Sequence, residues 1–489
     1  MTSVSAKTVL TLATLFAATA SVSAQQAPPM SQQQMHMHHH GDIQTVQPVY
    51  PRLGRAQEQA AGKLFTLDEA QRLAAASNPT LRQAQAELRA AKARAQQAAL
   101  YPNPTIGYTG DEIRGGSING GKQGFFLEQN VVTAGKLGKS RGVFEQETRL
   151  AELEAEEQKL RVQNAVKTAY YRVLAAQELL DTRTSLAQIE QNFAEVQRQL
   201  FNSGQADESE VLEAEVDAER RRLSTRMQEN TLREEWKSLA AIIGQPDLPQ
   251  SVVSGDLAQA WPEIDEAQVI EIIVTQAPAT RIANASSARA AAEITRSKSQ
   301  AIPDLRLRGG LEYNNEPLGT IPQAIGWEGI AEVAVQIPIF NRNQGNVAAA
   351  TADLDRAQLE KQRIALTLRE RAATIVDEYA NAKLMAIEYR DEMLPRAKKA
   401  YTLLDQKYGL MLASYPRVLE AQRKLFVLHA EYLMALETTW TTGIALQGFL
   451  LTDGLEAPAR PTDADRPLRE TNLPMPERTM SPLEQPPRP

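Results

Sequence analysis

Ile330-Ala331-Glu332-Val333-Ala334-Val335-Gln336-Ile337-Pro338-Ile339 is the stretch of sequence that decides the fold. From Val333 onward every second residue is apolar, and the residues between them are polar, small or proline. A period of two is that of a β-strand, whose successive side chains point to opposite faces of a sheet. The stretch therefore predicts a strand with one apolar face and one wetter face.

The same alternation precedes it in the chain. Between Leu305 and Tyr313 the apolar residues hold odd positions, and the charged residues Arg306, Arg308 and Glu312 hold even ones. A fainter version lies within Thr105 to Val132. Aromatic residues stand near the ends of these segments: Tyr108, Phe125, Tyr313, Trp327 and Phe340. Four amphipathic strands arranged as two hairpins are expected, and a small sheet packed on helices is the simplest alternative.

The two hairpins belong to an internal repeat of roughly 200 residues. Leu67-Asp68-Glu69-Ala70-Gln71 recurs as Ile264-Asp265-Glu266-Ala267-Gln268. Val211-Leu212-Glu213-Ala214 recurs as Val418-Leu419-Glu420-Ala421, and the landmarks between them keep their order. The chain therefore contains two similar halves, with a first repeat over 63–260 and a second over 261–453.

Each half is predicted to be mainly helical around its hairpin. The first half has a helix from Leu67 to Leu100 with a break near Asn78-Pro79, because proline disfavours helical geometry in the residue before it. A helix from Leu137 to Leu200 follows, which would be roughly 95 Å long, and a returning helix runs from Ser209 to Ile243. The matching long helix of the second half, Asn343 to Leu404, contains Pro395, where we expect a kink.

The long helix of the first half carries an apolar stripe at alternating steps of three and four residues: Leu186, Ile189, Phe193, Val196 and Leu200. That spacing keeps one seam of the helix facing a partner helix. The fold class expected is therefore mainly α with a small β part, built from duplicated helix, β-hairpin, long helix and helix units.

Composition excludes several classes of protein. The 489 residues contain no cysteine, which removes thiol catalysis, disulfides, cysteine-based zinc sites and a lipid-modified cysteine. Five histidines are present, and four of them lie between His36 and His40. No nucleotide-binding loop and no catalytic constellation is visible, so we expect no enzyme, no catalytic residue and no cofactor. The net charge of −7 with interspersed signs offers no basic face for nucleic acid.

The two ends of the chain differ in composition from the repeats between them. Residues 1–24 resemble a secretory signal peptide, with Lys7, an apolar stretch and the cleavage pattern Val22-Ser23-Ala24. Residues 25–62 form a leader rich in Met, His, Gln and Pro. Residues 454–489 form a proline-rich tail that we expect to be disordered. Export places the protein outside the cytoplasm.

Export and amphipathic strands together point to a membrane. Past the signal, no 18-residue apolar run exists, so a helical membrane protein is excluded. Open sheet edges are not tolerated in lipid, and membrane barrels begin at eight strands. If four strands per chain enter a membrane, several chains must pool them.

These features resemble the TolC-type outer-membrane efflux proteins over roughly residues 63–453. The resemblance rests on the duplicated pattern and on two motifs. One is the strand-to-helix junction from Val333 to Asn341 with Gly345 following, and the other is Lys407-Tyr408-Gly409 followed by Tyr415 to Ala421. The resemblance implies a homotrimer with a pooled β-barrel in outer-membrane lipid. It also implies a periplasmic α-helical tunnel that docks onto an adaptor (membrane fusion) protein and an inner-membrane pump of the resistance-nodulation-division type.

The resemblance also implies a pore constriction at the periplasmic tip, where acidic side chains narrow the passage. By position, the residues that flank the Val-Leu pair of each half are Glu210 and Glu213, and Arg417 and Glu420. Arg417 departs from the acidic pattern and could pair with a carboxylate or reduce cation selectivity. The alternative is that all four are surface charges near helix N-termini, where acids suit the helix dipole.

The leader carries the most distinctive metal chemistry: Met35, His36, Met37, His38, His39 and His40. Thioethers favour Cu(I), and imidazoles suit copper, zinc and nickel. An expression tag or low-complexity drift is the alternative reading of this run. The function predicted is an outer-membrane exit duct of a tripartite efflux system, for heavy-metal cations such as copper. The alternatives are a duct for organic drugs or secreted polypeptides, and a periplasmic coiled-coil scaffold.

Overall fold

The computed structural model describes residues 49–58, 60, 62–113, 121–317 and 324–457. The predicted signal peptide, residues 1–24, lies outside these described residues, as does the Met/His run of the leader. The described chain begins with the short helix α1 (Arg55–Glu58) and then contains two matching sets of elements.

The first set is α2 (Leu67–Ser77), α3 (Pro79–Gln97), β1 (Thr105–Asp111), β2 (Lys122–Val131), α4 (Lys136–Asn202) and α5 (Glu208–Ile243). The second set is α6 (Val269–Gln276), α7 (Pro278–Ser299), β3 (Leu305–Pro317), β4 (Ala324–Val335), α8 (Gln344–Glu388), the π-helical turn η1 (Tyr389–Met393), α9 (Leu394–Gly409) and α10 (Tyr415–Gln447). The duplicated order of helices and strands predicted from the sequence is therefore confirmed.

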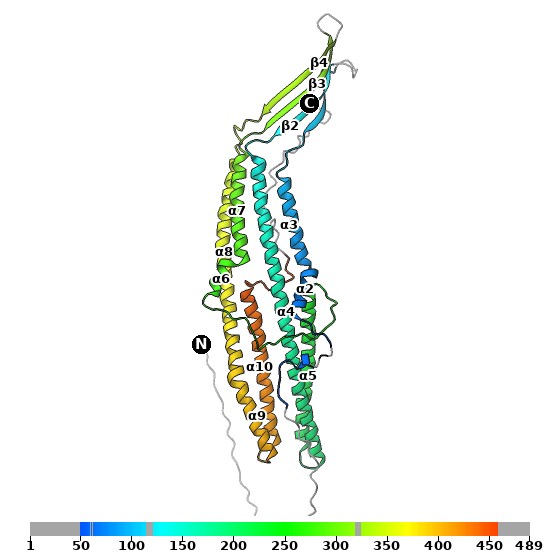
Figure 1. Ribbon diagram of the computed structural model, residues 1–489, viewed down its shortest axis with the longest axis vertical. Coiled ribbons are helices and arrows are strands. Elements are labelled where there is room, and N and C mark those ends of the chain that lie inside the picture. Colours follow the sequence, from blue (N-terminus) through cyan, green and yellow to red (C-terminus); the bar gives the residue numbers. More distant parts are fainter. Residues whose placement is uncertain (1–48, 59, 61, 114–120, 318–323, 458–489) are drawn as a thin grey trace, which may run out of the picture. The chain divides into compact units, whose positions relative to one another are not determined.

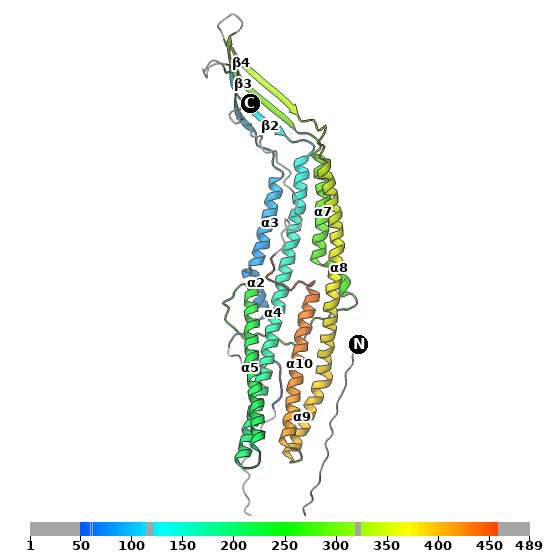
Figure 2. The ribbon, with the colours of Figure 1, turned by 180° about the vertical axis from the view of Figure 1, so that it is seen from behind.

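The helices run alongside one another, with the sheet beyond one end of them (Figure 1). Next to the sheet, α4 packs between α3 and α7, and α7 packs on α8. Toward the other end, the hairpin α4–α5 lies beside the hairpin α9–α10, and α10 contacts both α4 and α8 (Figure 2). The turns α4–α5 and α9–α10 thus lie at the same end, far from the sheet, and we call this end the tip.

Prolines and caps decide where helices stop. Asn78 ends α2 and caps α3, because its side-chain oxygen accepts from the backbone N–H of Thr80 and Pro79 takes the first helical position. Where the kink of the second half was expected, the π-helical turn η1 interrupts the α-helical ladder and ends two residues before Pro395. Proline lacks the N–H of the helical ladder and its ring crowds the preceding turn, so the ladder shifts there.

The core lies where α2, α4, α5 and α10 meet. Its largest fully buried side chains include Tyr170, Leu174 and Leu433. The Tyr170 hydroxyl donates to the backbone oxygen of Phe65 at 2.8 Å, and the Tyr379 hydroxyl donates to that of Pro262 at 2.6 Å. In both halves, therefore, a tyrosine of the long helix donates a hydrogen bond to the backbone of the segment that precedes the first helix of that half.

The predicted apolar stripe on α4 has its partner in α10. Leu186 and Ile189 are buried in one cluster with Leu419 and Phe426, and Phe193 packs against its edge. The seam predicted from three- and four-residue steps is thus confirmed at these positions.

The four strands form one antiparallel sheet in the order β1-β2-β3-β4. One boundary differs from the expectation, because the strand predicted to reach Ile339 ends at Val335. Pro338 cannot donate to a strand ladder, so Ile337 and Ile339 lie in the link to α8. Leu100, expected in the first helix, also lies beyond its helix, since α3 ends at Gln97.

Both ends of the described chain pack onto the helices. Val49 to Glu58, assigned by composition to the leader, contact α4, α9 and α10. Gly454, at the start of the predicted tail, is buried against Ala165, and its backbone oxygen accepts from the Thr80 hydroxyl. Composition alone missed these contacts because it carries no information on which groove a polar segment will enter. Residues 458–489 of the predicted tail lie outside the described residues.

Candidate functional site

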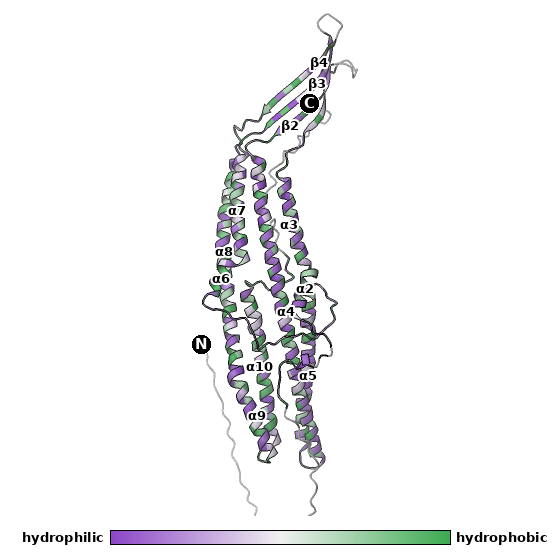
Figure 3. Cartoon of the chain, viewed as in Figure 1, coloured by the Kyte–Doolittle hydropathy of each residue, from purple (hydrophilic) through white to green (hydrophobic). Residues whose placement is uncertain are grey.

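One face of the sheet is apolar and exposed. Directly opposed strand residues share a face, and the register pairs Tyr108 with Phe125 and Tyr313 with Trp327. Trp327 is 73% exposed, and the large exposed side chains of this face are Ile106, Tyr108, Phe125, Leu127, Leu307, Leu311, Tyr313, Trp327, Val333 and Val335. Figure 3 shows apolar and polar positions following one another along β3 and β4. Exposed apolar patches mark sites of contact with proteins or membranes, and an outward apolar band is what membrane barrels present to lipid.

The opposite face carries the charges. Glu328 lies 3.4 Å from the Lys122 ammonium and accepts from the Asn314 amide at 3.3 Å. Glu332 lies 3.5 Å from Arg306 and 3.9 Å from Arg308, whose guanidinium stacks 3.9 Å above the Phe126 ring. In a water-soluble sheet the apolar face would be buried and this one wet. Here the charged face is the more sheltered one, with Glu312 and Asn314 both buried.

The four predicted constriction residues lie at the tip. Glu210 and Glu213 are in the first two turns of α5, and Arg417 and Glu420 are in those of α10. All four side chains are exposed. Within the described residues none of them makes a side-chain ion pair in the single chain, so Arg417 has no carboxylate partner there. The structure thus brings both halves of the candidate site to one end of the molecule with their charges facing solvent.

A second group of charges near the tip was not predicted from the sequence. Glu190 of α4 is 1% exposed and contacts two arginines, Arg423 of α10 and Arg221 of α5, the latter at 3.6 Å. Arg423 also lies 3.7 Å from Asp217 of α5. These four residues link three helices around one buried carboxylate. The available signal was the place of Glu190 on the stripe itself, one residue after Ile189 and three before Phe193.

The six leader residues proposed as metal ligands, Met35, His36, Met37, His38, His39 and His40, lie outside the described residues. Within the described ranges, no group of three or more His, Asp or Glu side chains is placed to hold a metal ion. His429 is buried between α10 and α4, with its Nδ1 3.2 Å from the Thr182 hydroxyl. Burial lowers the pKa of His429 to about 4, so this imidazole is neutral and structural at physiological pH.

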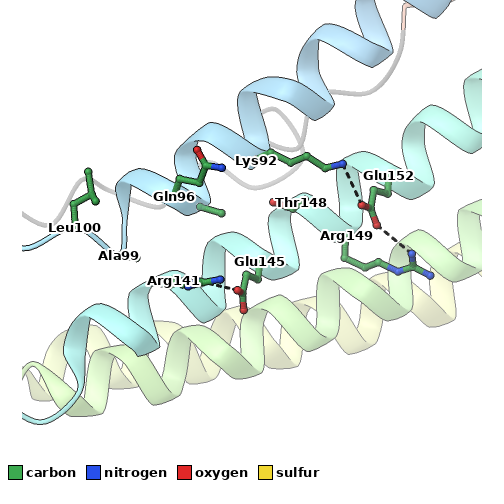
Figure 4. Close-up of a pocket in the computed structure, with 10 residues that line it drawn as sticks. Lys92, Gln96, Ala99, Leu100, Arg141, Glu145, Thr148, Arg149 and Glu152 are labelled. Carbon is green, nitrogen blue, oxygen red and sulfur yellow. Dashed lines mark hydrogen bonds and ion pairs between the residues drawn. The ribbon is translucent and has the colours of Figure 1, made fainter.

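A groove of about 680 Å³ lies between α3 and α4 on the side nearer the sheet (Figure 4). Its charged side chains largely satisfy one another: Glu152 lies 3.8 Å from Lys92 and 3.2 Å from Arg149, and Arg141 lies 2.8 Å from Glu145. We therefore assign this groove no ligand.

Within the parts of the chain that the structure describes, none of the helices combines the length and apolar character needed to cross a bilayer.

Known proteins resemble this chain in fold and in part of its sequence. The fold matches the open-state outer-membrane channel MtrE of Neisseria gonorrhoeae with a TM-score of 0.63, at 17% identity over 80% of this chain and 89% of that one. Residues 71–245 match the family model described as outer membrane efflux protein. This match covers the first half of the chain, from α2 to α5. The resemblance proposed from the sequence, the TolC type of outer-membrane efflux protein, is thereby confirmed.

Two further proteins are similar to this chain over most of their length. It is 24% identical over 403 residues to the cobalt-zinc-cadmium resistance protein CzcC of Cupriavidus metallidurans, covering 82% of this chain and 92% of that protein. It shares its fold with the transmembrane channel CusC at a TM-score of 0.59 and 18% identity, covering 78% of this chain and 91% of CusC.

The matches in sequence and fold support a coarse function. The protein is an outer-membrane efflux channel of a tripartite system and not an enzyme, as its composition predicted. Its relatives are outer-membrane proteins with a periplasmic tunnel, and the family forms trimers that work with an adaptor and a pump. The coiled-coil scaffold considered from the sequence is set aside.

Proposed function

We propose that this efflux protein is the exit duct for heavy-metal cations, copper among them. The observation that carries the proposal is the likeness to a protein named for cobalt, zinc and cadmium resistance, which extends over most of both chains. The Met/His run of the leader supports it independently, because thioethers and imidazoles are ligands for soft and borderline metal ions.

The proposed route runs from the tip to the sheet. At the tip, Glu210, Glu213 and Glu420 offer exposed carboxylates, and symmetry-related copies would repeat them around a central axis. A ring of carboxylates raises the local concentration of cations, and its effect is strongest at low ionic strength. Arg417 within the same ring would temper that attraction.

The proposed partners are two further copies of the chain, a periplasmic adaptor, an inner-membrane pump of the resistance-nodulation-division type, and outer-membrane lipid. The apolar face of the sheet fits the lipid. The tip fits the adaptor, because Leu410 and Met411 in the α9–α10 turn are 70% and 91% exposed at the end of the helices.

Deleting the gene from its host tests the cargo. We expect reduced survival in copper, zinc, cobalt or cadmium salts and unchanged survival in organic dyes and detergents. The plasmid-borne wild-type gene should restore survival. Unchanged metal tolerance together with new sensitivity to organic compounds would identify a drug duct instead.

Titration of the purified protein tests the leader separately. The wild-type protein should bind Cu(I) and Zn(II), and a variant lacking Met35 to His40 should lose that binding. Imidazoles ligate only when neutral, so affinity should fall as the pH drops through their titration range. Equal binding by both proteins would remove the leader site. Lost binding with unchanged metal resistance in cells would keep the site and remove its role in export.

A further inference from the structure

The segment from Val49 to Gln57 crosses between helices of the two tip hairpins. At its first end, Tyr50 packs edge-on against Tyr401 of α9, with ring centroids 5.3 Å apart. The Tyr50 hydroxyl shares a hydrogen bond with the Thr402 hydroxyl at 3.3 Å, and the Lys398 ammonium lies 5.4 Å from its ring centre. This end of the segment is therefore held by α9.

Val49 fills the seam between the hairpins. Its side chain packs against the buried cluster that contains Leu186 of α4 and Leu419 of α10, and its backbone oxygen accepts from the Gln422 amide of α10 at 3.3 Å.

The second end is fixed to α4 and to the linker after α5. The Gly54 N–H donates to the Glu178 carboxylate at 2.9 Å, and Arg55 donates to the Ser185 hydroxyl at 2.9 Å. Gln57 exchanges two hydrogen bonds with the backbone of Gly255, at 2.7 Å and 3.1 Å. Because both ends are anchored, α9 cannot move away from α4 without breaking the contacts at one end.

The segment holds α9, and the helical hydrogen-bond ladder is interrupted just before this helix. α4 is continuous through the level of the contacts, whereas α9 begins after the π-helical turn at Tyr389–Met393, where the regular ladder is interrupted. Such turns occur at places where helices bend and at functional sites. The contacts at Tyr401 and Thr402 lie on the tip side of this turn.

We propose that Val49–Gln57 is a latch that holds the α9–α10 hairpin against α4–α5 and so restricts the width of the passage at the tip. The latch rests on the proposed passage for its consequence, but the mechanical claim concerns only the two hairpins of one chain. Release of Tyr50 and Val49 frees α9 to swing about the π-helical turn.

Spin labels on the two turns of the tip test the latch directly. The chain has no cysteine, so Gln205→Cys in the α4–α5 turn and Leu412→Cys in the α9–α10 turn give a unique pair. Labelled chains are diluted with unlabelled ones, so that each trimer contains one pair, and the distance is measured by pulsed electron paramagnetic resonance. The double variant Val49→Ala, Tyr50→Ala should give a longer and broader distance distribution than the unmodified latch.

Arg52→Ala is the matched control, because Arg52 belongs to the same segment, is exposed, and makes no side-chain hydrogen bond or ion pair within the described residues. It should leave the distribution unchanged, and Tyr50→Phe, which keeps the ring, should stay close to it. An unchanged distribution in the double variant would overturn the latch. If that variant does not assemble, Tyr50→Ala alone should shift the distances in the same direction, and no shift would overturn the proposal equally. No cargo is present in the measurement, so its outcome is independent of the metal-resistance assay.

Discussion

Single residues near the tip show how charge is used inside an apolar seam. Glu190 is almost fully buried on the stripe of α4, and it is tolerated because Arg221 and Arg423 reach it from two other helices. A buried carboxylate without partners would be strongly unfavourable. The group therefore specifies which helices meet at this level, beyond what the apolar side chains require.

Replacing that carboxylate should destabilise the protein. Glu190→Gln removes the charge and leaves Arg423 and Arg221 facing a neutral amide, which should cost about 2 kcal/mol in the free energy of unfolding. Chemical denaturation of the purified protein measures the loss. Arg222→Gln is the control, since Arg222 makes only an exposed pair with Glu219 and should change stability by less than about 0.5 kcal/mol. Equal effects of the two changes would contradict a special role for Glu190.

His429 predicts an acid-sensitive packing of α4 and α10. Its pKa is lowered by burial from 6.5 to about 4, so between these values the unfolded chain takes up a proton and the folded chain does not. The contribution of neutral His429 to the free energy of unfolding is therefore fully present above pH 6.5. It falls as the pH drops toward 4 and levels off below it, with a total loss of up to about 3 kcal/mol. Comparing denaturation of the wild type and of His429→Leu across this window measures the effect. The wild type should lose more stability than the variant, and parallel pH profiles would refute the assignment.

At the scale of elements, breaks in the helices are local and chemical. Asn78 ends one helix and begins the next, and its amide also donates to the Ile242 backbone oxygen at 2.7 Å. The matching position of the second half is Ala277, which has no side chain to cap α7. Both halves have the same break between two helices at this junction, but only in the first half does a side chain cap the second helix.

Asn78→Ala should therefore be costly. It removes the cap of α3 and leaves the Thr80 N–H and the Ile242 carbonyl without this partner in a buried place, for an expected loss of about 2 kcal/mol. Ser203→Ala, at the exposed end of α4, is the control and should cost less than about 0.5 kcal/mol. Differential scanning calorimetry of the two variants gives the comparison, and a small shift in Asn78→Ala would show that water replaces the cap.

At the scale of the whole molecule, the sheet of a single chain is open at both edges. β1 and β4 are edge strands, and the sheet exposes apolar side chains on one face while its charges pair on the other. Open edges require pairing in lipid, and neighbouring copies supply it. Membrane barrels begin at eight strands, so a chain with four strands needs further copies to close one, and the trimers formed by the similar family would supply them.

The trimer and the proposed ring of carboxylates at the tip are tested by separate measurements. Native mass spectrometry of detergent-extracted protein should give three copies, and a soluble monomer obtained without detergent would contradict the membrane role.

In planar bilayers, Glu213→Gln combined with Glu420→Gln should weaken the block of conductance by divalent cations, because fewer carboxylates would face the proposed passage. Glu219→Gln, farther along α5, is the control. Unchanged block in the double variant would place Glu213 and Glu420 outside the passage.

The sequence by itself determined the elements, since periods of two and of three to four, prolines and the internal repeat are local properties of the chain. It predicted the duplicated halves, the partner-facing stripe from Leu186 and the amphipathic strands, because the same side chains that form an element also reveal its face. Only the tertiary structure decided what meets what: the three-helix contacts of Glu190, the burial of His429 against Thr182, and the anchoring of Val49 and Tyr50 between α4 and α9. Each of these arrangements includes a contact between residues more than 200 positions apart, and a polar side chain carries no periodic signal that identifies its distant partner.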